Sequence, residues 1–220
     1  MLKKIASEDY IKTISSLSIN GETKMVRITE IAKKLNVSIA AVSDMVKKLV
    51  KESLVINHAY KGVELTDKGA QMGLQLIRNH RLWEVFLVQV LKMPMEDIHD
   101  EAERLEHAVS EKLMERIDAH LGYPTVDPHG NPIPSLSGEI VFHKDEMKLQ
   151  NAELDSRYWI RRFGGLDPSY LQYISSKGVT IGTSLLVRFK FDDSLVCDID
   201  GSEFVITKES AERIFVSKQI

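Results

Sequence analysis

The fold of this chain is decided by residues 27–49, which read RITEIAKKLNVSIAAVSDMVKKL. The spacing of the apolar residues predicts a short helix capped by Thr29, a tight turn at Asn36-Val37, and a second helix from the cap Ser38 to about Glu52. Two short helices joined by a turn of about three to four residues are typical of the helix-turn-helix.

The segments on either side of this motif extend it to a winged helix. Residues 5–20 predict a helix that Asn20-Gly21 ends. The alternating run over residues 54–66 predicts a β-hairpin that turns at Lys61-Gly62 and forms the wing. A three-helix unit that serves packing alone is the alternative, but helix, turn, helix and wing occur in the required order. We therefore expect a DNA-binding domain over residues 1–66.

The second helix of the motif is expected to enter the major groove of double-stranded DNA. Small residues at its start allow the backbone to approach the groove, and nearby lysines supply contacts to phosphates. The predicted DNA-binding residues are Arg27, Ser38, Ala40, Ala41, Ser43, Asp44, Lys47, Lys48 and Lys61.

Composition and charge restrict the class of protein. With 43% hydrophobic and 28% charged residues among 220, the chain has the composition of an ordinary globular protein. It has no secretory signal pattern and no apolar run of the roughly 18 residues that span a membrane. Its one cysteine, Cys197, excludes an internal disulfide and fits the reducing cytoplasm, where we expect the protein. Residues 1–62 hold 11 Lys and Arg against 6 Asp and Glu, which indicates a localised nucleic-acid surface.

A second motif, His99-Asp-Glu-Ala-Glu103-Arg-Leu-Glu106-His107, indicates metal binding. On one helix, predicted from about residue 96 to 120, its histidines and Glu103 and Glu106 share roughly a third of the circumference. Glu106 lies at the edge of the apolar stripe, where a carboxylate is costly to bury unless a cation neutralises it. Asp, Glu and His are usual ligands of divalent metal ions. A solvated, charged helix face is the alternative.

A long helix predicted over residues 67–91, with Thr66 as its cap, carries His80 and Glu84 at otherwise apolar positions. For His80 the sequence leaves two interpretations: a hydrogen-bonded histidine of the core, or a metal ligand. Residues 122–138 hold four of the six prolines and predict a linker. Beyond Leu154, short strands and a helix near residues 168–176 predict a small β-barrel. The fold class is mainly α with a C-terminal β-barrel.

Together these features resemble the diphtheria toxin repressor family of metal-dependent bacterial regulators, over essentially the whole chain. The matching segments are Glu8-Asp9-Tyr10, the helix-turn-helix with Val42-Ser43, and residues 79–84, 99–107 and 128–134. The resemblance implies a homodimer with three domains. These are a winged helix-turn-helix over residues 1–66, a helical metal-binding and dimerisation domain over 67–138, and a Src-homology-3-like, ferrous-transport-accessory-like barrel over 139–220.

The resemblance also implies a regulatory metal site, formed by Asp9, Glu103, Glu106 and His107, with His80 near it. Iron-sensing members have Met and Cys where this chain has Asp9 and Glu103, and carboxylates favour Mn²⁺ over softer alternatives, while Fe²⁺ still fits. Two-metal manganese regulators have a carboxylate where Lys12 stands, so the chain looks more like the three-domain manganese repressors.

In those repressors a second site lies between the central domain and the barrel. The residues of this chain that match it, or the analogous site of the iron sensors, are Glu84, His99, Asp127 and His129, with Asp167 as a candidate from the barrel. The alternative for Asp127 and His129 is a proline-rich turn with polar loop residues.

The sequence thus predicts a metal-dependent repressor of metal-uptake genes that binds an inverted-repeat DNA operator as a homodimer, with Mn²⁺ or Fe²⁺ as the activating ion. A winged-helix regulator that senses an organic ligand or an oxidant is the first alternative, with Cys197 as its one redox group. A metalloenzyme is the second. We do not expect an enzyme, because the chain has no HExxH, no paired Glu-x-x-His and no nucleophile motif.

Overall fold

The computed structural model describes residues 2–20, 23–166 and 168–218, and the chain forms two compact units. The first unit comprises Met1–Trp83, Glu101–Tyr123 and Ile133–Ile140. The second unit comprises Glu84–Asp100, Pro124–Pro132 and Val141–Ile220. The three-domain division expected from the sequence is a different grouping and stays a prediction.

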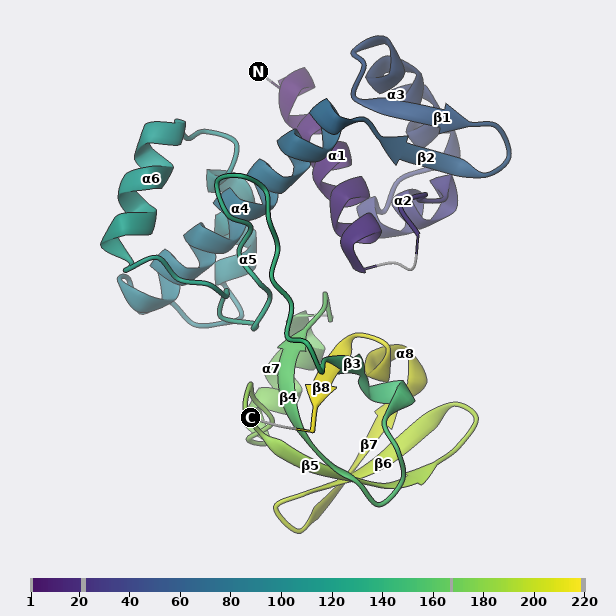
Figure 1. Cartoon of the computed structure of the whole chain (residues 1–220), viewed down its shortest axis with the longest axis vertical. Helices are drawn as coiled ribbons and strands as arrows, with labels where there is room; N and C mark the ends of the chain where they lie inside the picture. The colour runs from purple at the N-terminus through teal and green to yellow at the C-terminus, as the bar shows by residue number, and fades with distance from the viewer. Residues whose placement is uncertain (1, 21–22, 167, 219–220) are drawn as a thin grey trace. The chain divides into compact units, whose positions relative to one another are not determined.

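The first unit begins with the expected winged helix (Figure 1). It consists of α1 (Leu2–Asn20), α2 (Ile28–Leu35), α3 (Ile39–Lys51) and an antiparallel hairpin of β1 (Val55–His58) and β2 (Gly62–Leu65). Burial of apolar side chains drives these elements together. The buried core includes Ile11, Ile14, Ile31, Val42, Leu49 and Val63.

Side-chain caps determine where the two helices of the motif begin. Ser38 Oγ accepts a hydrogen bond from the Ala41 amide at 3.2 Å, which confirms Ser38 as the cap of α3. The prediction that Thr29 caps the first helix is wrong, because α2 begins before it. Arg27 is extended and donates its backbone N–H to Glu30 Oε2 at 2.8 Å, so the cap lies two residues earlier.

The wing is held against the segment that precedes α2. Val26 and Val63 exchange two backbone hydrogen bonds, of 2.9 and 2.8 Å. Gly62 has a φ of +136°, and a Cβ added to it would lie 2.4 Å from the carbonyl oxygen of Val26. Glycine at this position therefore permits both the backbone conformation and the close approach.

The helices after the wing differ from the prediction in one important respect. Thr66 caps α4 (Asp67–Gln89) as expected, since its Oγ1 accepts from the Gly69 amide at 3.1 Å. The single helix predicted over residues 96–120 is wrong, because the structure has α5 (Ile98–Leu105) and α6 (Glu111–His120) in its place. Ser110 is extended and caps α6 by accepting from the Leu113 amide at 3.3 Å. The chain between the two helices is a turn, and it carries Glu106 and His107.

A buried ion pair joins α4 to α6 within the first unit. Arg78 contacts the carboxylate of Asp118, and it also donates to the carbonyl oxygen of Pro134 at 2.6 Å. Both charged side chains are at most 10% exposed. Loss of either partner would leave a buried charge uncompensated and would therefore destabilise the packing of α4 against α6.

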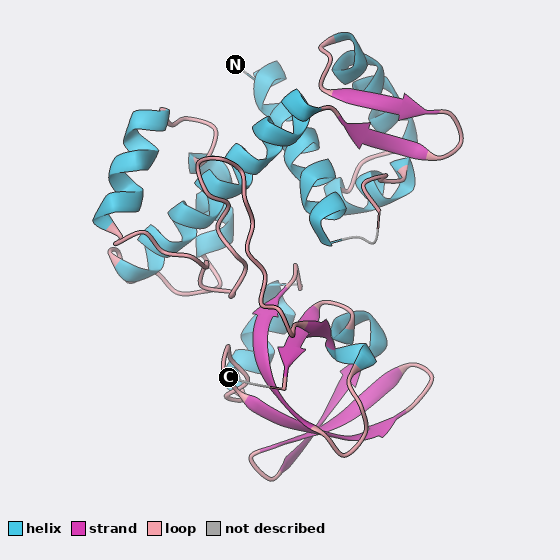
Figure 2. Ribbon diagram, viewed as in Figure 1, coloured by secondary structure: helices cyan, strands magenta, loops and turns pink. Residues whose placement is uncertain are grey.

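The second unit contains an antiparallel sheet of six strands, which Figure 2 shows in magenta. Their order is β3-β8-β4-β5-β6-β7. The strands are β3 (Met147–Lys148), β4 (Arg157–Phe163), β5 (Ser184–Lys190), β6 (Ser194–Ile199), β7 (Ser202–Thr207) and β8 (Ile214–Ser217). The 3-10 helix η1 (Leu149–Asn151) and the helices α7 (Pro168–Ser176) and α8 (Lys208–Ala211) complete the unit. Tyr158, Ile160, Leu185, Val187 and Cys197 are fully buried in its core.

The prediction of a closed β-barrel is wrong. β3 and β7 are the two edges of the sheet, and the described residues contain no hydrogen-bonded ladder that joins them. A barrel closes only when every strand has two neighbours. β3 is two residues long and pairs with β8 alone, so it is too short to close the sheet. The unit is an open antiparallel sheet.

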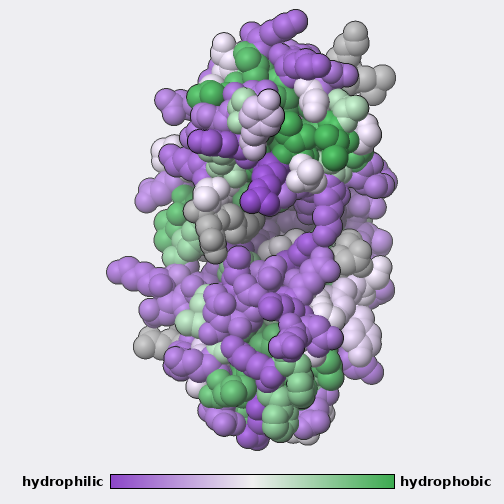
Figure 3. Space-filling view, turned by 90° about the vertical axis from the view of Figure 1, so that its right-hand side faces the viewer, coloured by the Kyte–Doolittle hydropathy of each residue, from purple (hydrophilic) through white to green (hydrophobic). Residues whose placement is uncertain are grey.

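The surface is consistent with the composition. On the face drawn in Figure 3, hydrophilic residues dominate and apolar residues form separate groups. Among the described helices, none combines the length and the apolar character that a membrane span requires.

Candidate metal centre

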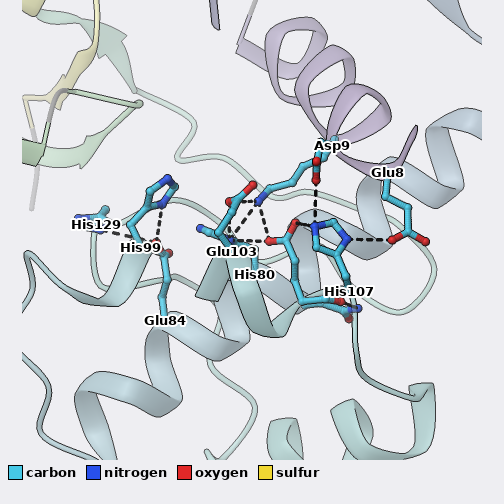
Figure 4. Close-up of polar contacts among 11 residues, drawn as sticks. Glu8, Asp9, His80, Glu84, His99, Glu103, His107 and His129 are labelled. Atoms are coloured by element: carbon cyan, nitrogen blue, oxygen red, sulfur yellow. Dashed lines mark hydrogen bonds and ion pairs between the residues drawn. The ribbon is translucent and has the colours of Figure 1, made fainter. Parts of the chain in front are cut away.

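Four parts of the first unit bring ionisable side chains together (Figure 4). α1 supplies Glu8, Asp9 and Lys12, α4 supplies His80, α5 supplies Glu103, and the turn after α5 supplies Glu106 and His107. Four of the five residues predicted for the regulatory site lie on α4, on α5 or in the turn, and Asp9 approaches from α1. The structure brings all five together, although Glu106 and His107 do not lie on the same helix as Glu103.

Lys12 occupies one side of this cluster. Its Nζ donates to Glu103 Oε2 and to Glu106 Oε2, at 2.6 Å each, and lies 3.1 Å from His80 Nδ1. His80 Nδ1 is also 2.6 Å from Glu106 Oε2. The Lys12 side chain is 15% exposed and that of Glu106 is 0% exposed. This side therefore holds a nearly buried cation between two carboxylates and an imidazole.

His107 occupies the other side of the cluster. Its Nδ1 lies 2.8 Å from Glu8 Oε2, and its Nε2 lies 2.9 Å from Asp9 Oδ1 and 3.5 Å from Glu106 Oε1. Glu106 Oε1 is buried, and it accepts no hydrogen bond from any described residue. The carboxylate of Glu106 thus directs Oε2 toward Lys12 and Oε1 toward the side of His107.

The residues on the side of His107 fit a divalent metal ion. Asp9, Glu103 and His107 each offer one ligand atom, and these atoms all lie within 4.8 Å of one another. Burial raises the pKa of the Asp9 carboxyl, and Glu103 and Glu106 raise this pKa further, whereas His107 and Lys12 lower it. When a carboxylate lies close to other carboxylates, an added positive charge stabilises its ionised form. Glu106 Oε1, a buried acceptor to which no described residue donates, fits the same role of ligand.

Glu8 is a residue of this centre that sequence reasoning did not identify as a member. Its contact with Nδ1 orients the His107 ring so that Nε2 faces Asp9 and Glu106. Carboxylates that hold the second nitrogen of a metal-binding histidine are a common feature of metal sites. The available signal was an acid next to Asp9, but neighbouring residues on a helix point in different directions.

The residues predicted for a second site are only partly brought together in the second unit. Glu84 is 2% exposed, and its Oε1 lies 3.5 Å from His99 Nδ1 and 3.8 Å from His129 Nε2 (Figure 4). Asp127 Oδ1 accepts from the backbone amides of His129 and Asn131, at 2.8 Å each, so it holds the turn that presents His129. Asp167 lies outside the described residues.

Arg27 directly precedes α2, whereas the other predicted DNA-binding residues lie at the cap of α3, on α3 or in the turn of the wing. Most of them are exposed. Lys47 has 72% of its side chain exposed and pairs with Asp44 at 2.8 Å. Lys48 differs from Lys47, because its Nζ donates a hydrogen bond to Ser7 Oγ of α1 at 2.7 Å. The contacts of these residues with bases and phosphates stay predictions.

Cys197, the redox group of the alternative function, is fully buried in the second unit. Burial raises the pKa of its thiol to about 12. The thiolate is the reactive form, so this cysteine is poorly suited to sensing an oxidant.

A winged helix combined with a partly buried cluster of carboxylates and imidazoles defines a DNA-binding protein with a site suited to a metal ion. Comparison with protein families agrees. Residues 4–63 match the family model described as "Iron dependent repressor, N-terminal DNA binding domain", and residues 66–135 match "Iron dependent repressor, metal binding and dimerisation domain". Residues 147–218 match the FeoA domain.

Individual relatives and solved structures agree as well. The diphtheria toxin repressor of Corynebacterium efficiens is 32% identical over an alignment of 194 residues, and the match covers 81% of this chain and 81% of that protein. The iron-dependent repressor IdeR of Mycobacterium tuberculosis is 38% identical over 130 residues, 59% of this chain and 56% of its own length. A manganese-dependent transcriptional repressor in complex with manganese superimposes with a TM-score of 0.87 and 33% identity, covering 97% of this chain and 100% of that one. The repressor ScaR with bound Zn²⁺ gives 0.84 and 35%, covering 97% and 99%.

The chain therefore belongs to the diphtheria toxin repressor family of metal-dependent transcriptional repressors. Its match to IdeR spans little more than half of that relative's length. The solved relatives include complexes with manganese, with zinc and with cadmium, so family membership does not fix the metal.

Proposed function

We propose that this protein is a manganese-activated repressor that binds an inverted-repeat DNA operator as a homodimer and controls genes of metal uptake. The observation that carries the proposal is Glu106 Oε1. It is a buried carboxylate oxygen that accepts no hydrogen bond from the described residues, and it faces His107 Nε2 beside Asp9. Lys12 pairs with Oε2 of the same carboxylate, so Oε1 is the oxygen that receives no hydrogen bond from the described residues, and a metal ion bound there would satisfy it.

The proposed ligands of the regulatory ion are Asp9, Glu103, Glu106 and His107. His80 contacts the same carboxylates from the side of Lys12, and Glu8 holds His107 in place. Three carboxylates and one imidazole form a mainly oxygen-based set without a thiolate. Such a set suits Mn²⁺ and also accepts Fe²⁺.

The proposed mechanism follows from the elements that carry the ligands. When bound, the ion supplies the positive charge that the carboxylates of Asp9, Glu103 and Glu106 require. Asp9 belongs to α1 of the winged helix, whereas Glu103 lies on α5 and His107 in the turn after it. Closing this set therefore fixes α1 relative to α5, which shifts the population toward a DNA-competent conformation without adding a contact to DNA.

A second metal site is proposed at Glu84, His99 and His129. It is supported by one buried carboxylate oxygen that lies within 4 Å of two imidazole nitrogens. Asp127 is better explained as the residue that holds the turn, because backbone amides engage its Oδ1. The DNA-binding residues on α3 and the wing, and the three domains over 1–66, 67–138 and 139–220, belong to the same proposal.

The test is a DNA-binding titration on the region upstream of the protein's own gene, with Mn²⁺, Fe²⁺ and Zn²⁺ in turn. Asp9→Ala and Glu103→Ala should lose the increase in DNA affinity that the metal causes and should remain folded. Asp100→Ala removes an exposed carboxylate of α5 and serves as the matched control. Unchanged metal dependence in Asp9→Ala would show that the regulatory ion binds elsewhere.

A further inference from the structure

The strand β7 is an edge of the sheet in the second unit, and among the described residues only β6 pairs with it. We propose that the outer edge of β7 pairs antiparallel with β7 of a second copy of this chain, and that this contact joins two repressor dimers. The inference goes beyond the proposed function, because it uses no residue of the metal centre or of the DNA-binding surface.

The hairpin of β6 and β7 determines which backbone groups of β7 face outward (Figure 1). Its two turn residues, Asp200 and Gly201, have positive φ values of 51° and 82°, so the turn is type I′ and the residues that flank it are hydrogen-bonded to each other. Pairs along an antiparallel ladder alternate, so the backbone N–H and C=O groups of Glu203 and Val205 point away from β6. No backbone group of another described segment bonds to them.

An apolar row crosses the outer face of the sheet and ends at this edge. Phe189 of β5 lies opposite Val196 of β6, and Val196 lies opposite Val205 of β7. Phe189 is 55% exposed and Val205 is 70% exposed. An edge strand that combines unpaired backbone groups with exposed apolar side chains is a template for pairing with another strand.

The side chains of β7 are complementary to themselves in one register. When two copies of β7 lie antiparallel with Val205 opposite Val205, the two valines exchange a pair of backbone hydrogen bonds. Glu203 of each copy then lies opposite Thr207 of the other copy. A register centred on Glu203 would instead place two carboxylates opposite each other, which is destabilising. The register centred on Val205 continues the apolar row into the second copy, and a two-fold contact between identical chains is the commonest arrangement of oligomers.

The inner face of β7 supports the same arrangement. A cavity of about 470 Å³ lies beside β7, and its lining includes Tyr170, Phe204, Ile206 and Ile214. In the register centred on Val205, Phe204 of one copy lies opposite Ile206 of the other, so each copy adds an apolar side chain beside the cavity of its neighbour. Burial of apolar surface on both faces of the strand therefore adds to the backbone hydrogen bonds.

The experiment measures the assembly of the full-length chain by sedimentation velocity over a range of protein concentrations in the presence of Mn²⁺. Val205→Lys places two ammonium groups opposite each other at the centre of the contact. Val141→Lys makes the same change at a valine of the second unit that is 74% exposed and lies outside the sheet, so it is the matched control. Binding to a single operator should be the same in both variants, which confirms that they are folded.

A cysteine at the same position tests the register. Opposite residues of a hydrogen-bonded pair have Cα atoms about 5.5 Å apart, which a disulfide can span. Val205→Cys should therefore form a disulfide between two chains under mild oxidation by diamide. Val141→Cys is the control, and the native Cys197 is fully buried.

We expect the unaltered chain and Val141→Lys to double their assembly mass as concentration rises, whereas Val205→Lys keeps the smaller mass. The disulfide should form with Val205→Cys and not with Val141→Cys. A single mass at every concentration, an assembly that doubles equally in Val205→Lys, or no disulfide in Val205→Cys would overturn the proposal. Each of these results would leave the proposed metal-dependent binding to one operator intact, because that function is measured separately.

Discussion

Replacing Glu8 with Ala is expected to weaken Mn²⁺ binding at the regulatory centre by about 10- to 100-fold. Glu8 does not face the proposed ion, because its Oε2 lies 2.8 Å from Nδ1 of His107, whereas Nε2 is the nitrogen that faces Asp9. The effect therefore acts through the orientation and basicity of the imidazole. Glu8 is therefore a positioning residue, which acts through His107.

The magnitude follows from the burial of the pair. The side chains of Glu8 and His107 are 9% and 6% exposed, so water competes little for their contact. A hydrogen bond to a charged group in such surroundings contributes about 1.5–3 kcal/mol. If ion binding depends on this contact, the loss corresponds to a factor of about 10 to 100 in the dissociation constant.

The assay is calorimetric titration of Mn²⁺, paired with the half-saturating Mn²⁺ concentration for DNA binding. Both values should shift by the same factor in Glu8→Ala. Glu8→Gln keeps an acceptor for His107, so its affinity should return toward that of the unaltered protein. Glu115→Ala, at an exposed acid of α6, controls for the loss of one negative charge. A shift below about twofold in Glu8→Ala, or equal losses in the Ala and Gln variants, would refute the positioning role.

Four further predictions follow from the described geometry. Burial and the neighbouring carboxylates of Glu103 and Glu106 raise the pKa of Asp9. Ionisation of Asp9 in the folded, metal-free protein therefore destabilises the fold as pH rises through that pKa. Asp9→Asn should raise the thermal midpoint of the metal-free protein at pH 7 and abolish the stabilisation by Mn²⁺. Asp9→Met with Glu103→Cys introduces sulfur ligands, so the ratio of half-saturating Mn²⁺ to Fe²⁺ in anaerobic DNA binding should rise. Lys48→Ala should weaken binding to all DNA sequences alike and flatten the salt dependence, since the expected partner is a phosphate. Because burial raises the pKa of Cys197 to about 12, its thiol should react with an alkylating reagent at pH 8 only after unfolding.

The winged helix could be predicted from sequence because its signals are local. Ser38 caps the helix that begins beside it, and Gly62 permits the close approach of the wing to Val26. Each signal acts within a few residues or repeats with a fixed period. The prediction was wrong at Thr29, where Glu30 competes by accepting the backbone N–H of Arg27.

The turn at residues 106–110 was missed because the apolar positions continue across it with helical spacing. Ser110 was the one local indication of a new helix, and its capping hydrogen bond to the Leu113 amide determines the break. The prediction of a closed barrel was wrong for a different reason. Strand pairing depends on partners far apart in sequence, and the two-residue length of β3 has no clear local signal.

The ligand residues of the centre were predictable from residue type and family resemblance, but their partners were not. Glu8 and Asp9 are neighbours on α1, and neighbouring residues of a helix do not face each other. They reach the same imidazole because His107 has two ring nitrogens, which point in different directions. Lys12, one turn further along α1, reaches the other side of Glu106. These contacts depend on the three-dimensional arrangement of the helices, so they could not be predicted from the sequence.

The position of these residues on α1 connects the centre to the recognition helix. Ser7 accepts a hydrogen bond from Lys48 of α3 at 2.7 Å, and Ile11 and Ile14 lie in the core shared with α3. Glu8, Asp9 and Lys12, on the same helix, contact Glu106 or His107 of the metal centre. A helix moves as a rigid element over these few residues, because its backbone hydrogen bonds link every turn to the next. An ion that fixes α1 against α5 and the turn after it therefore also restricts α3, and metal binding and DNA binding become coupled through one helix.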